Sequence, residues 1–156
     1  MSTATVDHEP GLMAGVMRLH LLVSAQLEAV ATAHGVTLSD YLVLAVIRRS
    51  PDGRTSPGHI CEVLHRTSGG MTLTLDRLEA AGWLVRAPDP SDRRKVSLSL
   101  TPAGERLAVT VNRSLHEWED TLGLGARRSR DVIAVVDEIA GLLEGAPIGR
   151  RAPGST

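Results

Sequence analysis

Apolar residues recur at intervals of three and four along three long stretches of the chain, and this spacing predicts amphipathic α-helices. The first stretch spans residues 11–34, and the other two lie within residues 102–145. The apolar stripe of the first helix is wider than one core face requires, because Met13, Met17 and Leu22 flank its main positions. We therefore expect this helix to contact a partner as well as the core.

Shorter helices are expected between the long ones. Ser39 is predicted to be the N-cap of the first of these. Ser56 and Pro57 start the next helix, because serine is a preferred N-cap and proline fits the first helical position. A third short helix follows residues 67–70 and stops at Gly82, a residue type that suits a helix C-terminus.

After these helices the pattern changes to the alternation typical of strands. Residues 83–86 and 96–100 are rich in β-forming side chains, and the polar segment 88–95 separates them. We predict a two-stranded hairpin with a basic tip. The order helix, tight turn, helix and hairpin suits duplex DNA, because such a helix can enter the major groove, about 12 Å wide, while the hairpin reaches phosphates or the minor groove.

Charge and composition place the basic surface in the middle of the chain. The net charge is -1, so no overall positive excess indicates a nucleic-acid partner. Residues 48–106, however, carry ten Lys or Arg against seven Asp or Glu. Aromatic residues make up only 2% of the chain, so the core must be aliphatic, which favours helices.

The sequence lacks the common catalytic motifs. It contains no nucleophile elbow, no zinc-peptidase HExxH, no phosphate-binding P-loop and no dinucleotide-binding glycine motif after a strand. We expect no enzyme activity, no cofactor and no metal. The single cysteine, Cys61, rules out an internal disulfide framework, and no stretch approaches the roughly 18 apolar residues of a membrane span. We expect a cytoplasmic protein with no membrane partner.

Small polar residues gather at the start of the third short helix, opposite Met71 and its apolar neighbours. These candidate DNA contacts are Ser68, Gly69, Thr72 and Thr74. Small side chains let a helix approach base edges, and the free N–H groups of its first turn favour phosphate oxygens. The alternative is that Thr67 or Ser68 only caps the helix and that Thr72 and Thr74 are merely solvated.

The hairpin tip supplies the other candidate DNA contacts. They are Arg93, Arg94 and Lys95, together with Arg54 further upstream. Asp92 is predicted to orient an arginine before DNA arrives, because a carboxylate can hold a guanidinium in one direction. The alternative is an ordinary solvated hairpin tip.

Residues 67–107 resemble the central segment of the MarR family of bacterial regulators. The most specific parts are LDRLEAAGWLVR, DPSDRR and LTPAGERL. The resemblance implies a mainly α fold, a winged helix-turn-helix with a two-stranded β wing and long N- and C-terminal dimerisation helices. It implies one domain over residues 1–156, with dimerisation helices at 11–34 and 102–145 and the DNA-binding region at 38–100.

The resemblance also implies a function. A homodimer would place one recognition helix in each half-site of a palindromic DNA operator, with Arg94 in the adjacent minor groove and Asp92 as its partner. Such a repressor is released by a small aromatic or phenolic effector. Met17, His20 and Tyr41 are candidates for lining the effector pocket, and burial in the core or dimer interface is the alternative.

Two features leave other functions open. Leu73 and Thr74 stand where close variants of the pattern carry a polar or basic pair, which suggests contact with thymine methyl groups. The same apolar residue favours a protein-interaction module that no longer binds DNA. Cys61 and His65 have the i, i+4 spacing that a redox- or metal-responsive sensor would use, and a buried structural thiol is the alternative.

Overall fold

The computed structural model describes residues 11–89 and 92–145. The chain divides into two compact units, Met1–His116 and Glu117–Thr156.

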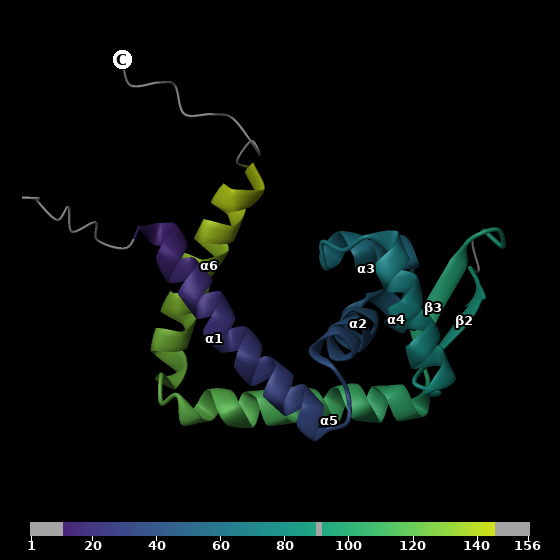
Figure 1. Cartoon of the computed structure of the whole chain (residues 1–156), viewed down its shortest axis with the longest axis horizontal. Coiled ribbons are helices and arrows are strands. Elements are labelled where there is room, and N and C mark those ends of the chain that lie inside the picture. Colours follow the sequence, from purple (N-terminus) through teal and green to yellow (C-terminus); the bar gives the residue numbers. More distant parts are fainter. Residues whose placement is uncertain (1–10, 90–91, 146–156) are drawn as a thin grey trace, which may run out of the picture. The chain divides into compact units, whose positions relative to one another are not determined.

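Helices dominate both units (Figure 1). The helices are α1 (Leu12–Ala33), α2 (Leu38–Arg49), α3 (Pro57–Val63), α4 (Ser68–Ala80), α5 (Pro102–Thr121) and α6 (Gly125–Gly145), with a 3-10 turn at Pro51–Gly53. The strands are β1 (Arg54–Thr55), β2 (Leu84–Pro88) and β3 (Val96–Leu100). The expected fold class, mainly α with a helix-turn-helix and a β wing, is therefore confirmed.

Side-chain hydrogen bonds define the starts of α2 and α3. Ser56 caps α3 as predicted, since its hydroxyl accepts a hydrogen bond from the His59 N–H at 3.2 Å. The predicted cap of α2 is wrong by two residues, because Thr37 and not Ser39 begins that helix. Thr37 Oγ1 accepts from the Asp40 N–H at 3.1 Å, and Asp40 Oδ2 accepts from the Thr37 N–H at 3.3 Å. This reciprocal pair satisfies two N–H groups at once, which a cap at Ser39 would not.

The sheet has three antiparallel strands in the order β1-β3-β2, so the predicted two-stranded hairpin has a third neighbour. Strands β2 and β3 pair from Leu84 opposite Leu100 to Pro88 opposite Val96. Strand β1 adds Arg54 opposite Ser99 on the other side of β3. A strand of two residues is too short for the alternation that identifies strands in sequence.

Unit Met1–His116 holds two clusters of buried side chains. The first joins α2, α3, α4, the sheet and the start of α5, and it contains Val43, Leu44, Ile47, Ile60, Met71, Leu75, Leu78, Leu84, Leu98 and Ala108. The second joins the end of α1 to α2 and α5, and it contains Ala31, Val36, Tyr41, Ala45 and Val111. Trp83 and Leu107 pack against both clusters, so the winged helix and the flanking ends of α1 and α5 share one continuous interior.

The junction between the wing and α5 is unusually close. A Cβ atom on Gly104 would lie 1.9 Å from the backbone oxygen of Trp83, so only glycine fits there. Thr101 holds the junction with its hydroxyl, which donates to the Gly82 carbonyl at 2.7 Å and accepts from the Gly104 N–H at 3.1 Å. The start of α5 is therefore locked against the base of the hairpin.

Two helical faces leave large apolar side chains in solvent. The α1 face, which by the helical period extends around most of the N-terminal half of the helix, consists of Leu12, Met13, Met17, Leu19, Leu21 and Leu22. The α6 face, in the second unit, consists of Val132, Ile133, Val135, Val136, Leu142 and Leu143. Among the described residues, no single helix is long and apolar enough to cross a membrane, and the one pair that reaches the length, α1 with α2, is bent by 85°.

Candidate nucleic-acid interface

Helices α3 and α4 form a helix-turn-helix, and α4 is its second helix. The turn between them passes through His65, whose φ of 49° lies in the left-handed region. Met71, Leu75 and Leu78 of α4 are buried as predicted. Ser68, Gly69 and Thr72 are exposed at its N-terminal end, where the sequence placed them.

Thr74 does not belong to this exposed group, and its predicted place on the outer face is wrong. Only 6% of Thr74 is exposed, and its hydroxyl donates to the Gly70 carbonyl at 3.2 Å. The helical period sets position 74 beside positions 71, 75 and 78, so the side chain points into the core. Its hydroxyl is satisfied locally, which allows a polar residue to occupy a buried position.

The first turn of α4 leaves its backbone donors open. Thr67 is the N-cap residue, but its side chain accepts no hydrogen bond from the helix. The hydroxyl of Thr72 donates to the Ser68 carbonyl at 3.0 Å, so its lone pairs remain available as acceptors. Exposed N–H groups at a helix start favour anionic oxygens, because the helix dipole is positive there.

Two arginines hold α4 in place, and sequence reasoning missed both. Arg77 donates from Nε to Oδ1 of Asp40 at 3.1 Å, which connects α4 to the capped start of α2. Asp40 is only 4% exposed, so this carboxylate serves both the helix cap and the ion pair. Its position three residues after Thr37 is the one sequence signal that would have marked Asp40.

Arg86 connects the wing to α4. It lies on β2 and donates from Nη2 to Oδ1 of Asp76 at 2.7 Å, and it also pairs with Glu79. Burial by itself lowers the pKa of Arg86, but the hydrogen bonds that Arg86 donates to Asp76 and Glu79 outweigh it, and the pKa lies above its ordinary value. Both acids sit on α4, so helix and hairpin are braced as one unit.

The tip of the wing carries exposed basic side chains. Arg93, Arg94 and Lys95 are all exposed, and 91% of the Arg94 side chain is accessible. Asp92 Oδ1 accepts hydrogen bonds from the backbone N–H of Arg94 at 3.1 Å and from its Nε at 3.3 Å. Backbone hydrogen bonds from Lys95 to the Asp92 carbonyl and from Asp89 to the Lys95 carbonyl close the turn. The predicted pairing of Asp92 with Arg94 is present.

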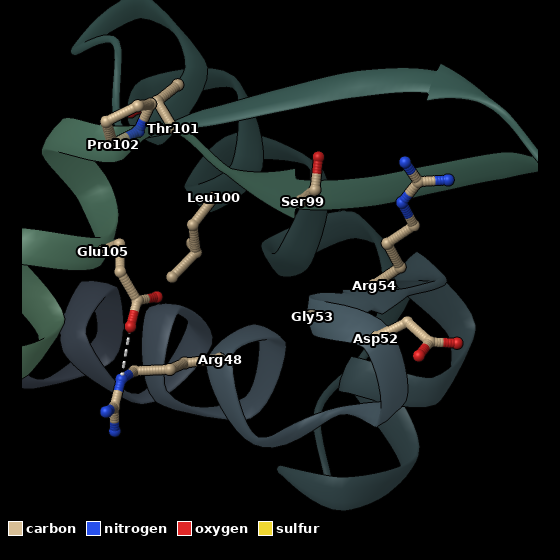
Figure 2. Close-up of a pocket in the computed structure, with 9 residues that line it drawn as sticks. All are labelled: Arg48, Asp52, Gly53, Arg54, Ser99, Leu100, Thr101, Pro102 and Glu105. Atoms are coloured by element: carbon tan, nitrogen blue, oxygen red, sulfur yellow. Dashed lines mark hydrogen bonds and ion pairs between the residues drawn. The ribbon is translucent and has the colours of Figure 1, made fainter.

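Arg54 lies on β1, at the opposite edge of the sheet from β2. It borders a cavity of about 380 Å³ between the end of α2, the sheet and the start of α5. An ion pair from Arg48 Nε to Glu105 Oε1 at 2.7 Å lies at one end of this cavity, and the Arg54 guanidinium lies away from that pair, on the side of Ser99 (Figure 2). Arg54 is exposed, so it remains accessible to a phosphate.

The three effector-pocket candidates are not gathered in unit Met1–His116. Met17 is 58% exposed, and His20 is exposed with Ser24 Oγ at 3.5 Å from its Nδ1. Tyr41 is 5% exposed and donates to Asn112 Oδ1 at 3.3 Å. It belongs to the core cluster of Ala31, which lies about 21 Å along α1 from Met17 at the helical rise. None of the three lines the cavity between α2 and α5.

The pKa of the Tyr41 phenol is shifted from its ordinary value. Burial raises the pKa of Tyr41, and the positive charges of Arg49 and Arg48 offset only part of that effect. The phenol is therefore held in its neutral form as a donor to Asn112.

Cys61 and His65 are not arranged as a metal site. Cys61 is half-buried and packs against the first core cluster, whereas His65 is exposed. Within residues 11–89 and 92–145, no three His, Cys, Asp or Glu side chains gather closely enough to hold a metal ion.

Comparisons with known proteins point in one direction. The sequence model of the MarR family matches residues 34–95. The chain is 36% identical over 114 residues to the HTH-type transcriptional regulator PecS of Dickeya dadantii, which covers 72% of this chain and 67% of PecS. It is 39% identical over 69 residues to the multiple antibiotic resistance protein MarR of Salmonella typhimurium, about half of that protein (46%) and 44% of this chain. A mutant MarR from E. coli, solved in complex with operator DNA, is 26% identical with a TM-score of 0.62 over 83% of this chain and 98% of that one.

Proposed function

The chain belongs to the MarR family of winged helix-turn-helix transcriptional regulators, and we propose that it represses transcription as a homodimer on a palindromic operator. One observation carries this proposal: Arg86 braces α4 and the wing into a single unit that exposes both a helix start and three basic side chains. The similar E. coli protein was solved with operator DNA. We infer that α4 and the wing of this chain have the same use.

In the proposed complex, the N-terminal end of α4 lies in the major groove. Ser68, Gly69 and Thr72 approach base edges and phosphates, and the open N–H groups of the first turn bind phosphate oxygens. Arg94 enters the neighbouring minor groove, with Arg93 and Lys95 beside it and Asp92 holding its direction. Arg54, on the far edge of the sheet, is proposed as a phosphate contact.

The homodimer rests on the apolar faces of α1 and α6. Contiguous exposed apolar surface of this kind marks a protein interface, because a monomer would leave it in water. The same residue pattern on two copies is self-complementary around a two-fold axis, and a two-fold dimer matches a palindromic operator. We propose that these two faces bind their counterparts in a second copy.

Relief by a small aromatic or phenolic effector and a cytoplasmic location complete the proposal. An effector pocket that included Met17 and His20 would need a second copy, because both side chains are open to solvent in one chain. Binding of salicylate, followed by calorimetry in the presence and absence of operator, tests this part.

The test of DNA binding is a salt titration on a random duplex, followed by fluorescence anisotropy. We expect the logarithm of affinity to fall linearly with the logarithm of salt concentration, because each neutralised phosphate releases counterions. Arg94→Ala should weaken binding on the order of a hundredfold, since each of two copies loses a charge-assisted contact of about 1.5 kcal/mol. Arg106→Ala, an exposed arginine on α5, is the control and should bind like the unaltered protein.

A protein-interaction module is the second candidate, and Leu73 favours it. This side chain is 70% exposed on the outer face of α4, where a leucine would suit an apolar partner. A module that no longer binds DNA would show no dependence of duplex affinity on salt concentration. A sloping titration with an unaltered Arg94→Ala affinity would keep DNA binding but remove the wing from it.

A further inference from the structure

We propose that Leu73 is a specificity-determining residue that recognises the 5-methyl group of a thymine in each half-site. This inference rests on the proposed function, since it requires α4 to lie in the major groove. The thymine methyl is the apolar feature of the major-groove edge, and an aliphatic side chain recognises it by contact alone.

Leu73 is more exposed than any other large apolar side chain among the described residues, at 70%. It lies on the outer face of α4, since Met71, Leu75 and Leu78 define the buried face. An exposed leucine in the middle of a helix that is otherwise patterned correctly has no role in the core of its own chain.

The side chain of Leu73 has open space around it. Helical side chains lean toward the N-terminus, so Leu73 leans toward Gly69 one turn earlier. Gly69 has no side chain, and nothing lies within 4 Å of where its Cβ would be. A base edge can therefore approach Leu73 without displacing any neighbour.

The polar side chains on the same face already use their donors or charges in hydrogen bonds, and the Thr72 hydroxyl oxygen stays open as an acceptor. The Thr72 hydroxyl donates to the Ser68 carbonyl, and Asp76 accepts from Arg86. Arg77, one turn after Leu73, is held by Asp40.

The long donors that read guanine and adenine are thus missing from this part of α4. Residues 68–76 contain no Arg, Lys, Asn or Gln. Arginine and lysine read guanine, and asparagine and glutamine read adenine. Leu73 is left as the longest uncommitted side chain that can meet a base edge, so apolar contact is the readout this helix offers.

The occupant of this face is DNA and not an apolar protein, because of the charge beside it. Arg86 fixes α4 to the wing, and the wing carries the exposed Arg93, Arg94 and Lys95. A single leucine within a basic surface suits a polyanion with apolar methyl groups better than an extended apolar partner.

The experiment replaces thymine with deoxyuridine, which removes only the methyl group. Duplexes that bind the full-length protein are first selected from a random pool. Each thymine of the half-site is then replaced in turn, on both half-sites together, and affinity is measured by anisotropy. We expect one position to lose about fourfold per half-site, or about fifteenfold for the dimer, from the roughly 0.8 kcal/mol of one buried methyl group.

Leu73→Ala completes the cycle. This variant should bind thymine and uracil duplexes equally, while its thermal melting stays unchanged because the side chain is exposed. Val109→Ala, which removes another exposed apolar side chain from α5, is the control and should keep the preference for thymine.

Three results would overturn the proposal while leaving the proposed function intact: selected half-sites without thymine, equal affinity of the unaltered protein for thymine and uracil at every position, or discrimination that survives in Leu73→Ala. Each is read in protein that still shows salt-dependent binding. Absence of DNA binding at low salt overturns the proposed function, and this inference with it, and would instead favour a protein ligand for Leu73.

Discussion

The winged helix and the long terminal helices differ in whether their apolar side chains are buried within a single chain. In the winged helix, Leu44, Ile60 and Leu98 are fully buried by their own chain. In α6, by contrast, no described residue is buried, and Val132 and Val136 are 43% and 47% exposed. Amphipathic helices occur in both regions, so an amphipathic pattern alone does not say whether a helix is covered by its own chain or by another.

This difference indicates which parts of the chain depend on a second copy for their stability. Packing of the winged helix needs no partner, and its stability should not change with protein concentration. The α1 and α6 faces gain their burial only on association, so their stability should rise with concentration.

Gly104→Ala should have the largest effect, because it disrupts packing within the winged helix and the adjoining start of α5. The added Cβ would lie 1.9 Å from the Trp83 oxygen, which is backbone and cannot move aside cheaply. We expect a loss of about 3 kcal/mol or more in the free energy of unfolding, measured by urea denaturation. Gly58→Ala is the matched control, since its Cβ would meet only the Ser56 Oγ at 3.8 Å. Equal stability of the two variants would contradict the close junction.

Val136→Glu should weaken association of two copies through the α6 face. A carboxylate at the centre of the α6 face would be buried without a partner in a dimer, at a cost of several kcal/mol. We expect the dissociation constant of the dimer to rise more than about a hundredfold in sedimentation equilibrium. Ala134→Glu, at an exposed position about 160° from Val136 by the helical period, is the matched control and should leave association unchanged. A Val136→Glu protein that associates normally would show that α6 is not an interface.

Arg86→Ala should have an intermediate effect. It should lower operator affinity more than it lowers the free energy of unfolding. Its partners are partly exposed, so solvent screens the ion pairs, and we expect only about 1 kcal/mol of lost stability. Operator affinity should fall further than stability, because wing and α4 are no longer braced. Arg48→Ala, which removes the pair with Glu105, is the control and should leave affinity unchanged. Parallel losses in both variants would mean that the brace has no special role.

The smallest effect concerns Tyr41 and alkaline pH. Its pKa is raised by burial, so the folded state keeps the phenol proton at a pH where the unfolded chain releases it. The stability that this proton contributes is present below pH 10 and is lost as pH rises above it. Melting temperature should therefore fall less steeply between pH 9.5 and 11 in Tyr41→Phe than in the unaltered protein, and identical slopes would argue against the raised pKa.

The helices could be predicted from sequence because their signals are local. Ser56 and Pro57 mark a helix start by their own chemistry, and Gly82 marks an end. Strand β1 could not be predicted, because its two residues become a strand only by pairing with β3. The same limit applies to Gly104, whose necessity comes from a carbonyl twenty-one positions away.

The contacts of the candidate site that could be predicted are those between residues close together in the sequence. Asp92 and Arg94 are two residues apart, and their contact follows from the turn. Thr74 was misplaced because polarity was taken to mean exposure, although its hydroxyl is satisfied by the Gly70 carbonyl. The Asp40 contact with Arg77 joins residues 37 positions apart, and no periodicity connects them.

Hydroxyl-radical footprinting on a duplex selected from a random pool tests the central claim, that braced α4-and-wing units of two copies bind successive turns of DNA. We predict two protected segments related by a two-fold axis, about 10 base pairs apart, each with a neighbouring minor groove that loses protection in Arg94→Ala. A single protected segment, or protection with no two-fold relation, would contradict it.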